Sequence, residues 1–358
     1  MNRYVLLFVS LALAVPSFAQ TKVSPVNAKI KYTGRIDFSD PHTPRFSYSG
    51  VTIGIEFTGT SMSAGFRPST DDNYYYSILD NGNPVKIHLT QSEQEYDIAR
   101  GLVDTVHHLT LVKLTEASLG IDTFTGFTLD EGDSLVTLPQ GNGRVIEFIG
   151  NSITCGYGDE TDKISDGFRP DQENFYETYA AVTARAFRAD AVAVCKSGIG
   201  MYRNYGGPVT GTDNTMPEMY DRTLFKTAEP TWDFSSVIPD IVCVNLGTND
   251  TSLGLFDPDL FSLACTAFLQ RIRANYPDAL VIYLIGPMMG DEAAASVRTA
   301  VEKSYAEIGD PNMKIFKMST QTGEFGIGGN HHPTVAQHRY NAFELINYIQ
   351  SITNWHAE

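Results

Sequence analysis

Residues 145–158 read Val-Ile-Glu-Phe-Ile-Gly-Asn-Ser-Ile-Thr-Cys-Gly-Tyr-Gly, and this stretch indicates how the second half of the chain folds. Its apolar run has the length and composition of a buried strand, and the run ends in Gly150, Asn151 and Ser152. In a parallel α/β sheet, ligands bind in the crevice at the carboxyl ends of the strands. We therefore interpret Ser152 as a nucleophile. The alternative is that Ser152 only caps a helix, as serine often does after a strand.

The chain after this stretch alternates strand-like and helical segments. We expect further strands at residues 191–195, 241–246, 280–285 and 314–316, and helices at 175–188, 260–276, 292–308 and 334–352. Continuous apolar strands that alternate with helices predict a parallel sheet covered by helices on both faces. The second half of the chain is therefore predicted to be a three-layer α/β domain.

The chain before this stretch has the pattern of an antiparallel β domain. Between about residues 26 and 139, short runs alternate polar and apolar side chains, and turn signals separate them. The Asp-Asn-Gly sequence at 80–82 is a strong hairpin signal. We predict a β-sandwich of jelly-roll type over residues 20–140. The Gly-rich cluster at 139–143 is a linker by composition, so the second domain is expected to span 144–358.

Composition and charge exclude several classes of function. The 358 residues are 42% hydrophobic and 19% charged, which is typical of a globular protein. The formal net charge is -16, and phosphate binding requires surplus Lys and Arg, so we expect no nucleic-acid partner. A neutral polysaccharide or a small ester would not be repelled by this charge.

The N-terminus has the pattern of a secretory signal peptide at residues 1–19. Arg3 supplies a positive charge, residues 6–15 are apolar, and the small-x-small sequence at 17–19 is a cleavage site. The alternative is a membrane anchor, but the apolar run is too short to span a bilayer comfortably. We expect a secreted or periplasmic protein that has no membrane contact after cleavage, and we expect a monomer.

Three of the four cysteines are predicted to be reduced core residues. Cys195 and Cys243 lie within apolar strand-like runs, and Cys265 lies on an apolar helical face. A disulfide is the alternative, because an exported chain permits one. The spacing of the cysteines fits no zinc motif, so we predict no metal and no organic cofactor.

Four polar segments follow predicted strand ends and supply the groups that acyl transfer requires. Ser152 and His332 are the candidate nucleophile and base, with His331 as the alternative base. The backbone N–H groups of Ser152 and Gly198 and the side-chain amide of Asn249 are candidate donors for the oxyanion. Because parallel strands end at one edge of a sheet, we expect the four segments to converge. They are residues 150–152, 197–200, 246–250 and 331–333.

This constellation resembles the GDSL/SGNH hydrolases. That group carries Ser, Gly, Asn and His in four ordered blocks, and Ser152, Gly198, Asn249 and His332 occur here in that order. This chain departs from the SGNH pattern at two positions: the residue before the serine, and the acid that orients the histidine. Asn151 stands where Asp is usual before the serine, a position that supports the turn rather than the chemistry.

A closer resemblance is to carbohydrate esterase family 2, and it covers nearly the whole mature chain. The similar stretches are residues 101–116, 124–127, 150–158 and 332–336. The resemblance implies an N-terminal jelly-roll joined to a flavodoxin-like SGNH domain with a parallel sheet. It also implies a secreted serine esterase that removes O-acetyl groups from plant cell-wall polysaccharides of xylan or mannan type through an acyl-enzyme. The implied partner is an acetylated polysaccharide or oligosaccharide.

The second departure from the SGNH pattern is the group that orients the base. Many SGNH hydrolases have Asp three residues before the His, where this chain has Gly329. Family 2 tolerates a dyad in which a backbone carbonyl orients the His. We therefore expect the His331 carbonyl or the Asn330 side chain to orient His332. The missing acid also leaves an alternative function, a carbohydrate-binding protein whose hydrolase domain has lost activity.

Aromatic side chains are candidates for sugar binding, because a sugar ring can stack on an aromatic face. Tyr202 and Tyr205 follow Gly198 in the predicted loop, and Trp232 lies further along the chain. The alternative is that these aromatic side chains pack in the core. His338, one turn into the last predicted helix, is expected at the surface.

Overall fold

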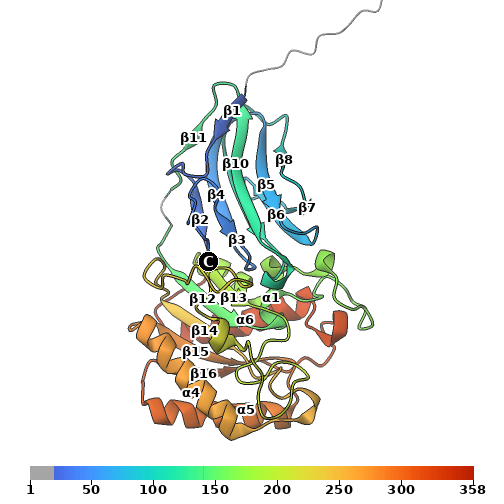
Figure 1. Ribbon diagram of the computed structural model, residues 1–358, viewed down its shortest axis with the longest axis vertical. Helices are drawn as coiled ribbons and strands as arrows, with labels where there is room; N and C mark the ends of the chain where they lie inside the picture. Colours follow the sequence, from blue (N-terminus) through green and yellow to red (C-terminus); the bar gives the residue numbers. More distant parts are fainter. Residues whose placement is uncertain (1–19, 140) are drawn as a thin grey trace, which may run out of the picture.

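The computed structural model describes residues 20–139 and 141–358, which form two domains stacked along the long axis of the molecule (Figure 1). The first domain is all β, and the second alternates strands and helices, which confirms the predicted fold class. The predicted signal peptide, residues 1–19, lies outside the described residues. Within the described part of the chain, no helix is both long enough and apolar enough to cross a membrane.

The N-terminal domain is a sandwich of two antiparallel sheets. The first sheet contains β1 (Gln20–Val23), β3 (Arg45–Phe46), β5 (Met62–Pro68), β8 (Gln94–Ala99) and β10 (Asp122–Asp130). The second contains β2 (Lys31–Thr33), β4 (Thr52–Gly59), β6 (Asn73–Leu79), β7 (Val85–Leu89), β9 (Thr105–Lys113) and β11 (Leu135–Val136). In β4, every second residue is buried, and Ile53, Ile55 and Phe57 form part of the core between the sheets. This period of two is the pattern that predicted the strands.

The turn between β6 and β7 follows the predicted hairpin signal. Asp80 and Asn81 have φ values of 51° and 56°, and the Gly82 N–H donates to the Leu79 carbonyl at 2.8 Å. Two consecutive residues with positive φ are characteristic of the tight hairpin turn that matches the twist of its strands.

The C-terminal domain is built on a five-stranded parallel sheet of order β13-β12-β14-β15-β16. The strands are β12 (Val145–Gly150), β13 (Asp190–Cys195), β14 (Ile241–Asn245), β15 (Leu280–Ile285) and β16 (Met313–Lys317). In chain order within this domain the arrangement is 2-1-3-4-5, which is the flavodoxin-like order. The order reverses beside β12, so the crevice at its carboxyl end is the expected binding position.

Helices cover both faces of this sheet. The longer ones are α2 (Tyr179–Ala186), α4 (Pro258–Asn275), α5 (Asp291–Ile308) and α6 (Val335–Ile352), and the short ones are α1 (Ser152–Cys155) and α3 (Met216–Met219). Residues of α4 and α5 share one apolar cluster with one face of the sheet, and residues of α2 and α6 share another with the opposite face. The helix expected at 175–188 is shorter than predicted, because a 3-10 turn at Phe175–Glu177 precedes it.

A buried ion pair ties the two domains together. Arg35, from the loop after β2, donates to Glu147 in β12 at 3.0 Å, and both side chains are almost completely buried. The Tyr220 hydroxyl donates to the other Glu147 oxygen at 2.5 Å. Because the desolvated charges satisfy one another, the β-sandwich has a defined position against the parallel sheet.

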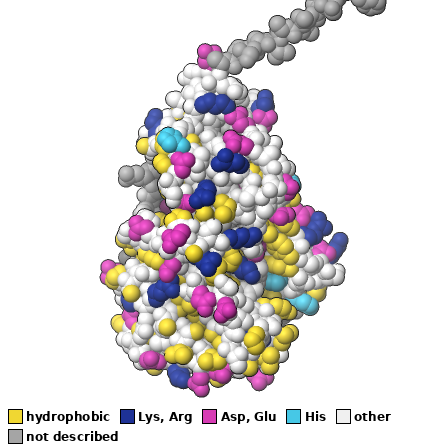
Figure 2. All heavy atoms as spheres, in the orientation of Figure 1, with side chains coloured by type: hydrophobic (Ala, Val, Ile, Leu, Met, Phe, Trp, Pro, Cys, Tyr) yellow, Lys and Arg dark blue, Asp and Glu magenta, His cyan; other side chains and the backbone are white. Residues whose placement is uncertain are grey.

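The burial of the cysteines and the distribution of charged side chains on the surface agree with the expectations from composition. All four cysteines are buried free thiols, which confirms that they are reduced core residues. Figure 2 shows acidic side chains interspersed with Lys and Arg over both domains on the face that it presents.

Candidate active site

Ser152 lies at the carboxyl end of β12, in a sharp turn from strand to helix. Asn151 precedes α1 as its N-cap, and its side chain accepts a hydrogen bond from the Ile153 N–H at 3.0 Å. A Cβ at Gly150 would lie 2.0 Å from the Thr154 hydroxyl oxygen, so only glycine fits there. Asn151 is therefore the capping residue, and the alternative interpretation of Ser152 as the cap is wrong. Ser152 is left with its hydroxyl facing a cavity.

His332 meets Ser152 from the other end of the domain. Its Nε2 lies 2.8 Å from the Ser152 Oγ, although the residues are 180 positions apart in the sequence. His332 follows the 3-10 turn Gly329–His331 and precedes Thr334, whose side chain caps α6. The ring that contacts the serine belongs to His332 and not to the alternative, His331. The distance is that of a nucleophile hydrogen-bonded to its general base.

The group that orients His332 differs from both expectations. His332 Nδ1 lies 3.0 Å from the backbone carbonyl oxygen of Gly329. The His331 carbonyl instead accepts from the Gln321 side chain at 2.6 Å, and the Asn330 amide donates to the Tyr157 hydroxyl at 2.7 Å. The backbone explains the difference, because Asn330 and His331 have φ values of 48° and 65°. Two left-handed residues turn the chain so that the carbonyl three residues before the ring faces it. Gly329, which stands where many SGNH hydrolases have Asp, thus supplies the hydrogen-bond acceptor from its backbone carbonyl.

Tyr157 supports His332 from its face, and the sequence analysis did not identify it. The two ring centroids are 4.2 Å apart with an interplanar angle of 27°. Tyr157 also packs against Phe168, and its hydroxyl accepts the bond from Asn330. The side chain of Asn330 therefore reaches the imidazole only through Tyr157. The signal was available, because Tyr157 lies five residues after Ser152 in the same motif.

Burial sets the protonation state of His332. Desolvation lowers the pKa of the imidazole from 6.5 to about 4, against smaller upward contributions from the Gly329 and Asn330 backbone. The ring is therefore neutral at neutral pH, as a general base must be.

His338, in the first turn of α6, is buried, and its ring accepts a hydrogen bond from the Tyr179 N–H of α2 at 3.3 Å. The expectation that it lies at the surface is wrong. The helical face that carries it packs on the sheet.

The candidate oxyanion donors lie in the same cavity as Ser152. This cavity of about 670 Å³ is lined by Ser152 and His332 and also by Gly198 and Asn249. Gly198 has a φ of 78°, a left-handed conformation that other residues rarely adopt. One N–H of the Asn249 side chain donates to the Ile199 carbonyl at 2.8 Å, and an amide carries a second donor. The four segments therefore converge as the sheet topology predicts.

Asp250 joins two of these segments. Its buried carboxylate accepts hydrogen bonds from the backbone N–H groups of Met201, Tyr202 and Arg203 at 2.9–3.1 Å. Desolvation raises the pKa of this carboxyl to about 6, and the backbone donors act against the increase. The carboxylate thus fixes the loop after Gly198 to the segment that carries Asn249.

Only one of the three aromatic candidates lies at the cavity. Tyr205 lines it and is 65% exposed. Tyr202 is buried, and its hydroxyl accepts from the Asp257 N–H at 2.9 Å. Trp232 lies at the domain interface, where the Arg35 guanidinium is 5.3 Å from its ring centroid. Tyr202 and Trp232 therefore lie away from the Ser152 cavity, contrary to the prediction that they bind substrate there.

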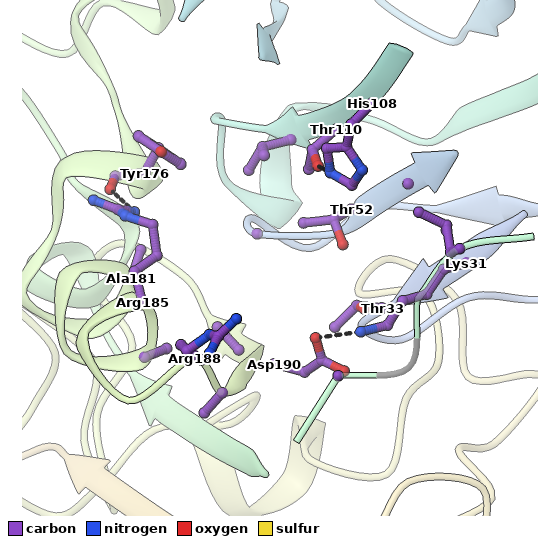
Figure 3. Close-up of a pocket in the computed structure, with 18 of the residues that line it drawn as sticks. Lys31, Thr33, Thr52, His108, Thr110, Tyr176, Ala181, Arg185, Arg188 and Asp190 are labelled. Atoms are coloured by element: carbon purple, nitrogen blue, oxygen red, sulfur yellow. Dashed lines mark hydrogen bonds and ion pairs between the residues drawn. The ribbon is translucent and has the colours of Figure 1, made fainter. Parts of the chain in front are cut away.

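A second cavity lies between the domains and contains none of the predicted site residues. It has a volume of about 590 Å³ and is lined by strand residues such as Thr52 and Thr110 and by α2 residues such as Arg185. Figure 3 shows that Lys31 of the sandwich and Asp190 of the hydrolase domain, both in the lining of this cavity, are in direct contact. The predicted nucleophile, base and oxyanion donors thus line the cavity at Ser152 and not this one.

Both halves of the chain match described families. Residues 32–139 match the carbohydrate esterase 2 N-terminal family, and residues 148–339 match the GDSL-like lipase/acylhydrolase family. The solved structure of a family two carbohydrate esterase from Clostridium thermocellum in complex with cellohexaose is 35% identical. The alignment covers 91% of this chain and 99% of that one, with a TM-score of 0.86. The chain belongs to carbohydrate esterase family 2.

Curated proteins agree with this family 2 assignment. The cellulase/esterase CelE of Acetivibrio thermocellus is 37% identical over 333 residues, and this chain spans 40% of its length. An acetylxylan esterase/glucomannan deacetylase of Cellvibrio japonicus is 26% identical over 328 residues, covering 91% of this chain and 89% of that protein. This family 2 protein is therefore a carboxylic ester hydrolase.

Proposed function

We propose that this enzyme removes O-acetyl groups from plant cell-wall polysaccharides of xylan or mannan type. The observation that carries the proposal is the 2.8 Å contact between Ser152 Oγ and His332 Nε2. The contact lies in a cavity that also presents Gly198 and Asn249. Relatives named acetylxylan esterase/glucomannan deacetylase support the choice of acetyl group and glycan.

The reaction proceeds through an acetyl-enzyme. Ser152 Oγ attacks the acetyl carbonyl carbon while His332 Nε2 takes the hydroxyl proton. The oxyanion that forms is held by the N–H groups of Ser152 and Gly198 and by the free N–H of Asn249. The intermediate collapses, and His332 returns the proton to the sugar oxygen as it leaves. Water, deprotonated by the same imidazole, then attacks the acetyl carbon, and the imidazolium returns the proton to Ser152 Oγ as the C–O bond breaks and acetate leaves.

The dyad requires another way to stabilise the imidazolium. The Gly329 carbonyl accepts from Nδ1–H and so fixes the tautomer that leaves Nε2 free to take a proton. A neutral carbonyl stabilises a positive ring less than a carboxylate does. The face of Tyr157, stacked on the ring, places π electrons beside the charge that develops. These two contacts perform the role of the absent acid.

The surroundings favour a neutral glycan in the medium outside the cell. Tyr205 offers an exposed ring beside the nucleophile, where a sugar can stack. The net charge of -16 repels polyanions, whereas acetylated xylan and mannan backbones are uncharged. The signal sequence at residues 1–19 supports export, to the medium or the periplasm, and we propose that the mature enzyme acts as a monomer.

The test is acetate release from acetylated xylan, acetylated glucomannan and acetylated simple sugars. We expect the mature enzyme to release acetate from at least one polysaccharide, and Ser152→Ala to abolish the release. Ser252→Ala is the matched control, because Ser252 lines the same cavity but accepts its hydrogen bond from the Gly206 N–H, away from His332. Release by Ser152→Ala at the normal rate would overturn the mechanism. Glycan binding without release from any substrate would favour the alternative of an inactive carbohydrate-binding protein.

A further inference from the structure

A carboxylate from the β-sandwich reaches the loop that carries a candidate oxyanion donor. Glu116 lies three residues after β9, just before a 3-10 turn at Ala117–Leu119, and its side chain is buried. Its Oε2 accepts a hydrogen bond from the backbone N–H of Ser197 at 2.8 Å. Ser197 directly precedes Gly198, so the contact crosses from one domain to the active site of the other.

The contact is one half of a reciprocal link. The backbone N–H of Glu116 donates to Glu173 Oε2 at 2.8 Å, and Glu173 belongs to the hydrolase domain. Each domain therefore supplies a buried carboxyl group to the backbone of the other. The Ser118 hydroxyl donates to Glu116 Oε1 and holds the glutamate side chain in this direction. A charge-assisted bond, such as the one that the Glu116 carboxylate accepts from Ser197, is shorter and stronger than a bond between neutral groups.

The Ser197 segment has few other close contacts on its own side. The Ser197 hydroxyl is buried without a hydrogen-bond partner among the residues that the structure describes. The neighbouring backbone bonds, from Lys196 N–H to Gly150 and from Ile199 N–H to Lys196, are both 3.3 Å long. The Gly198 carbonyl accepts from the Tyr205 N–H at 2.9 Å, and the bond to Glu116, at 2.8 Å, restrains the residue that precedes Gly198. Gly198 itself has a φ of 78° and adds no side-chain packing.

The electrostatics of the buried Glu116 and Glu173 side chains are compatible with this reciprocal link between the domains. Burial, and after it the negative charge of Glu116, raise the pKa of Glu173 well above its usual range. This increase favours the protonated form of Glu173 and reduces repulsion within the pair. The buried ammonium of Lys113 lies on the sandwich side, where it donates to Asn73 and Thr115.

We propose that Glu116 is a positioning residue for the oxyanion hole, so that the β-sandwich takes part in catalysis by orienting the Gly198 N–H. The proposal rests on the acyl-transfer function proposed above. Oxyanion donors lower the barrier only when they point at the oxygen of the tetrahedral intermediate, and displacement of a positioning contact by about 1 Å can cost about a hundredfold in rate. Glu116 touches no reacting atom and acts only through Ser197.

The experiment compares three replacements of Glu116 with a control at another interdomain contact. Glu116→Asp keeps the charge but shortens the arm, Glu116→Ala removes the acceptor, and Glu116→Gln keeps an acceptor oxygen of the same reach. The control is Lys31→Met. Lys31 binds Asp190 across the same pair of domains at 2.7 Å, at the second cavity and away from Ser197 (Figure 3).

Two readouts separate positioning from folding. The first is kcat and KM for 4-nitrophenyl acetate, and the second is the rate at which a 4-nitrophenyl phosphonate modifies Ser152. We expect Glu116→Asp and Glu116→Ala to lower kcat and the phosphonate rate about tenfold to a hundredfold, with KM changed less than about twofold. Glu116→Gln is expected to stay within about threefold of the wild type, and Lys31→Met to match it.

The outcomes are distinguishable from failure of the proposed function. Glu116→Asp with wild-type kcat would overturn the positioning role, and it decides the question if Glu116→Ala does not fold. Equal losses in Lys31→Met and Glu116→Asp would also overturn it, because domain docking in general would then explain the effect. The phosphonate reports on Ser152 and its oxyanion hole whatever the natural ester is. A failure with acetylated glycans alone would therefore count against the proposed substrate and leave this result intact.

Discussion

The pH dependence of ester hydrolysis follows from the burial of His332. Desolvation lowers the pKa of this imidazole to about 4 from its usual 6.5. At pH 5 a base of pKa 4 is about 90% neutral, whereas a base of pKa 6.5 is about 3% neutral, a difference of about thirtyfold in active enzyme. We therefore expect kcat/KM to be nearly constant from pH 7.5 down to pH 5 and to fall only below that.

The assay measures initial rates of acetate release at low substrate concentration between pH 3.5 and 8, with enzyme-free hydrolysis subtracted at each pH. Stability requires a parallel control. His332 and His338 are protonated in the unfolded chain below pH 6.5 but stay neutral in the fold down to about 4 and 3. The unfolded state then binds more protons, so stability falls as the pH drops through this window. Intrinsic fluorescence should establish at which pH values the enzyme is folded.

A rate profile with a midpoint near pH 6.5, in enzyme that is folded at every pH, would refute the reasoning. It would mean that the imidazole is hydrated like a free side chain. The contacts with Tyr157 and Gly329 would then not exclude water from the base.

Three further predictions concern stability and substrate binding. Arg35→Met should lower the free energy of unfolding in urea by about 3–5 kcal/mol, because it leaves the buried Glu147 unpaired; an unchanged transition midpoint would contradict this. Tyr205→Ala should raise KM for acetylated oligosaccharides severalfold, whereas Trp232→Ala should lower the thermal unfolding temperature and leave KM unchanged; the reverse pattern would return Trp232 to the substrate site. Asp250→Asn should lower both kcat and the unfolding temperature, because three backbone donors lose a carboxylate acceptor, and wild-type values of both would contradict that role.

The architecture was predictable because hydrophobic periodicity specifies it. The alternation in β4 and the continuous apolar run of β15 distinguish a half-buried antiparallel sheet from a buried parallel one. Because the sheet of the C-terminal domain is parallel, the carboxyl ends of its strands lie at one edge. The approach of Ser152 and His332 then follows from topology, although 180 residues separate them.

The details of the site depended on backbone geometry that residue types do not encode. The positive φ values of Asn330 and His331 decide which carbonyl faces His332, and the sequence had predicted the His331 carbonyl or the Asn330 side chain instead. The aromatic candidates were misplaced for a similar reason. A tyrosine such as Tyr202 has the same composition signal whether its hydroxyl faces a sugar or the backbone of Asp257.

The burial of charged residues between the domains was the feature that the sequence predicted least well. Arg35 and Glu116 stand in a polar-apolar pattern where charged residues normally face water. Each is buried only because the second domain covers it and supplies partners from more than 80 positions away. The residue pattern of one domain does not indicate which of its charged residues the other domain will cover.

The central claim is that Ser152 carries the acetyl group during turnover, and rapid quenching in acid tests it most directly. Enzyme mixed with excess 4-nitrophenyl acetate, quenched within the first turnovers and digested, should show one acetyl group on the peptide that contains Ser152. Ser152→Ala treated in the same way should show none. Turnover of the wild type without acetylation of that peptide, or with the acetyl group on another residue, would contradict the account.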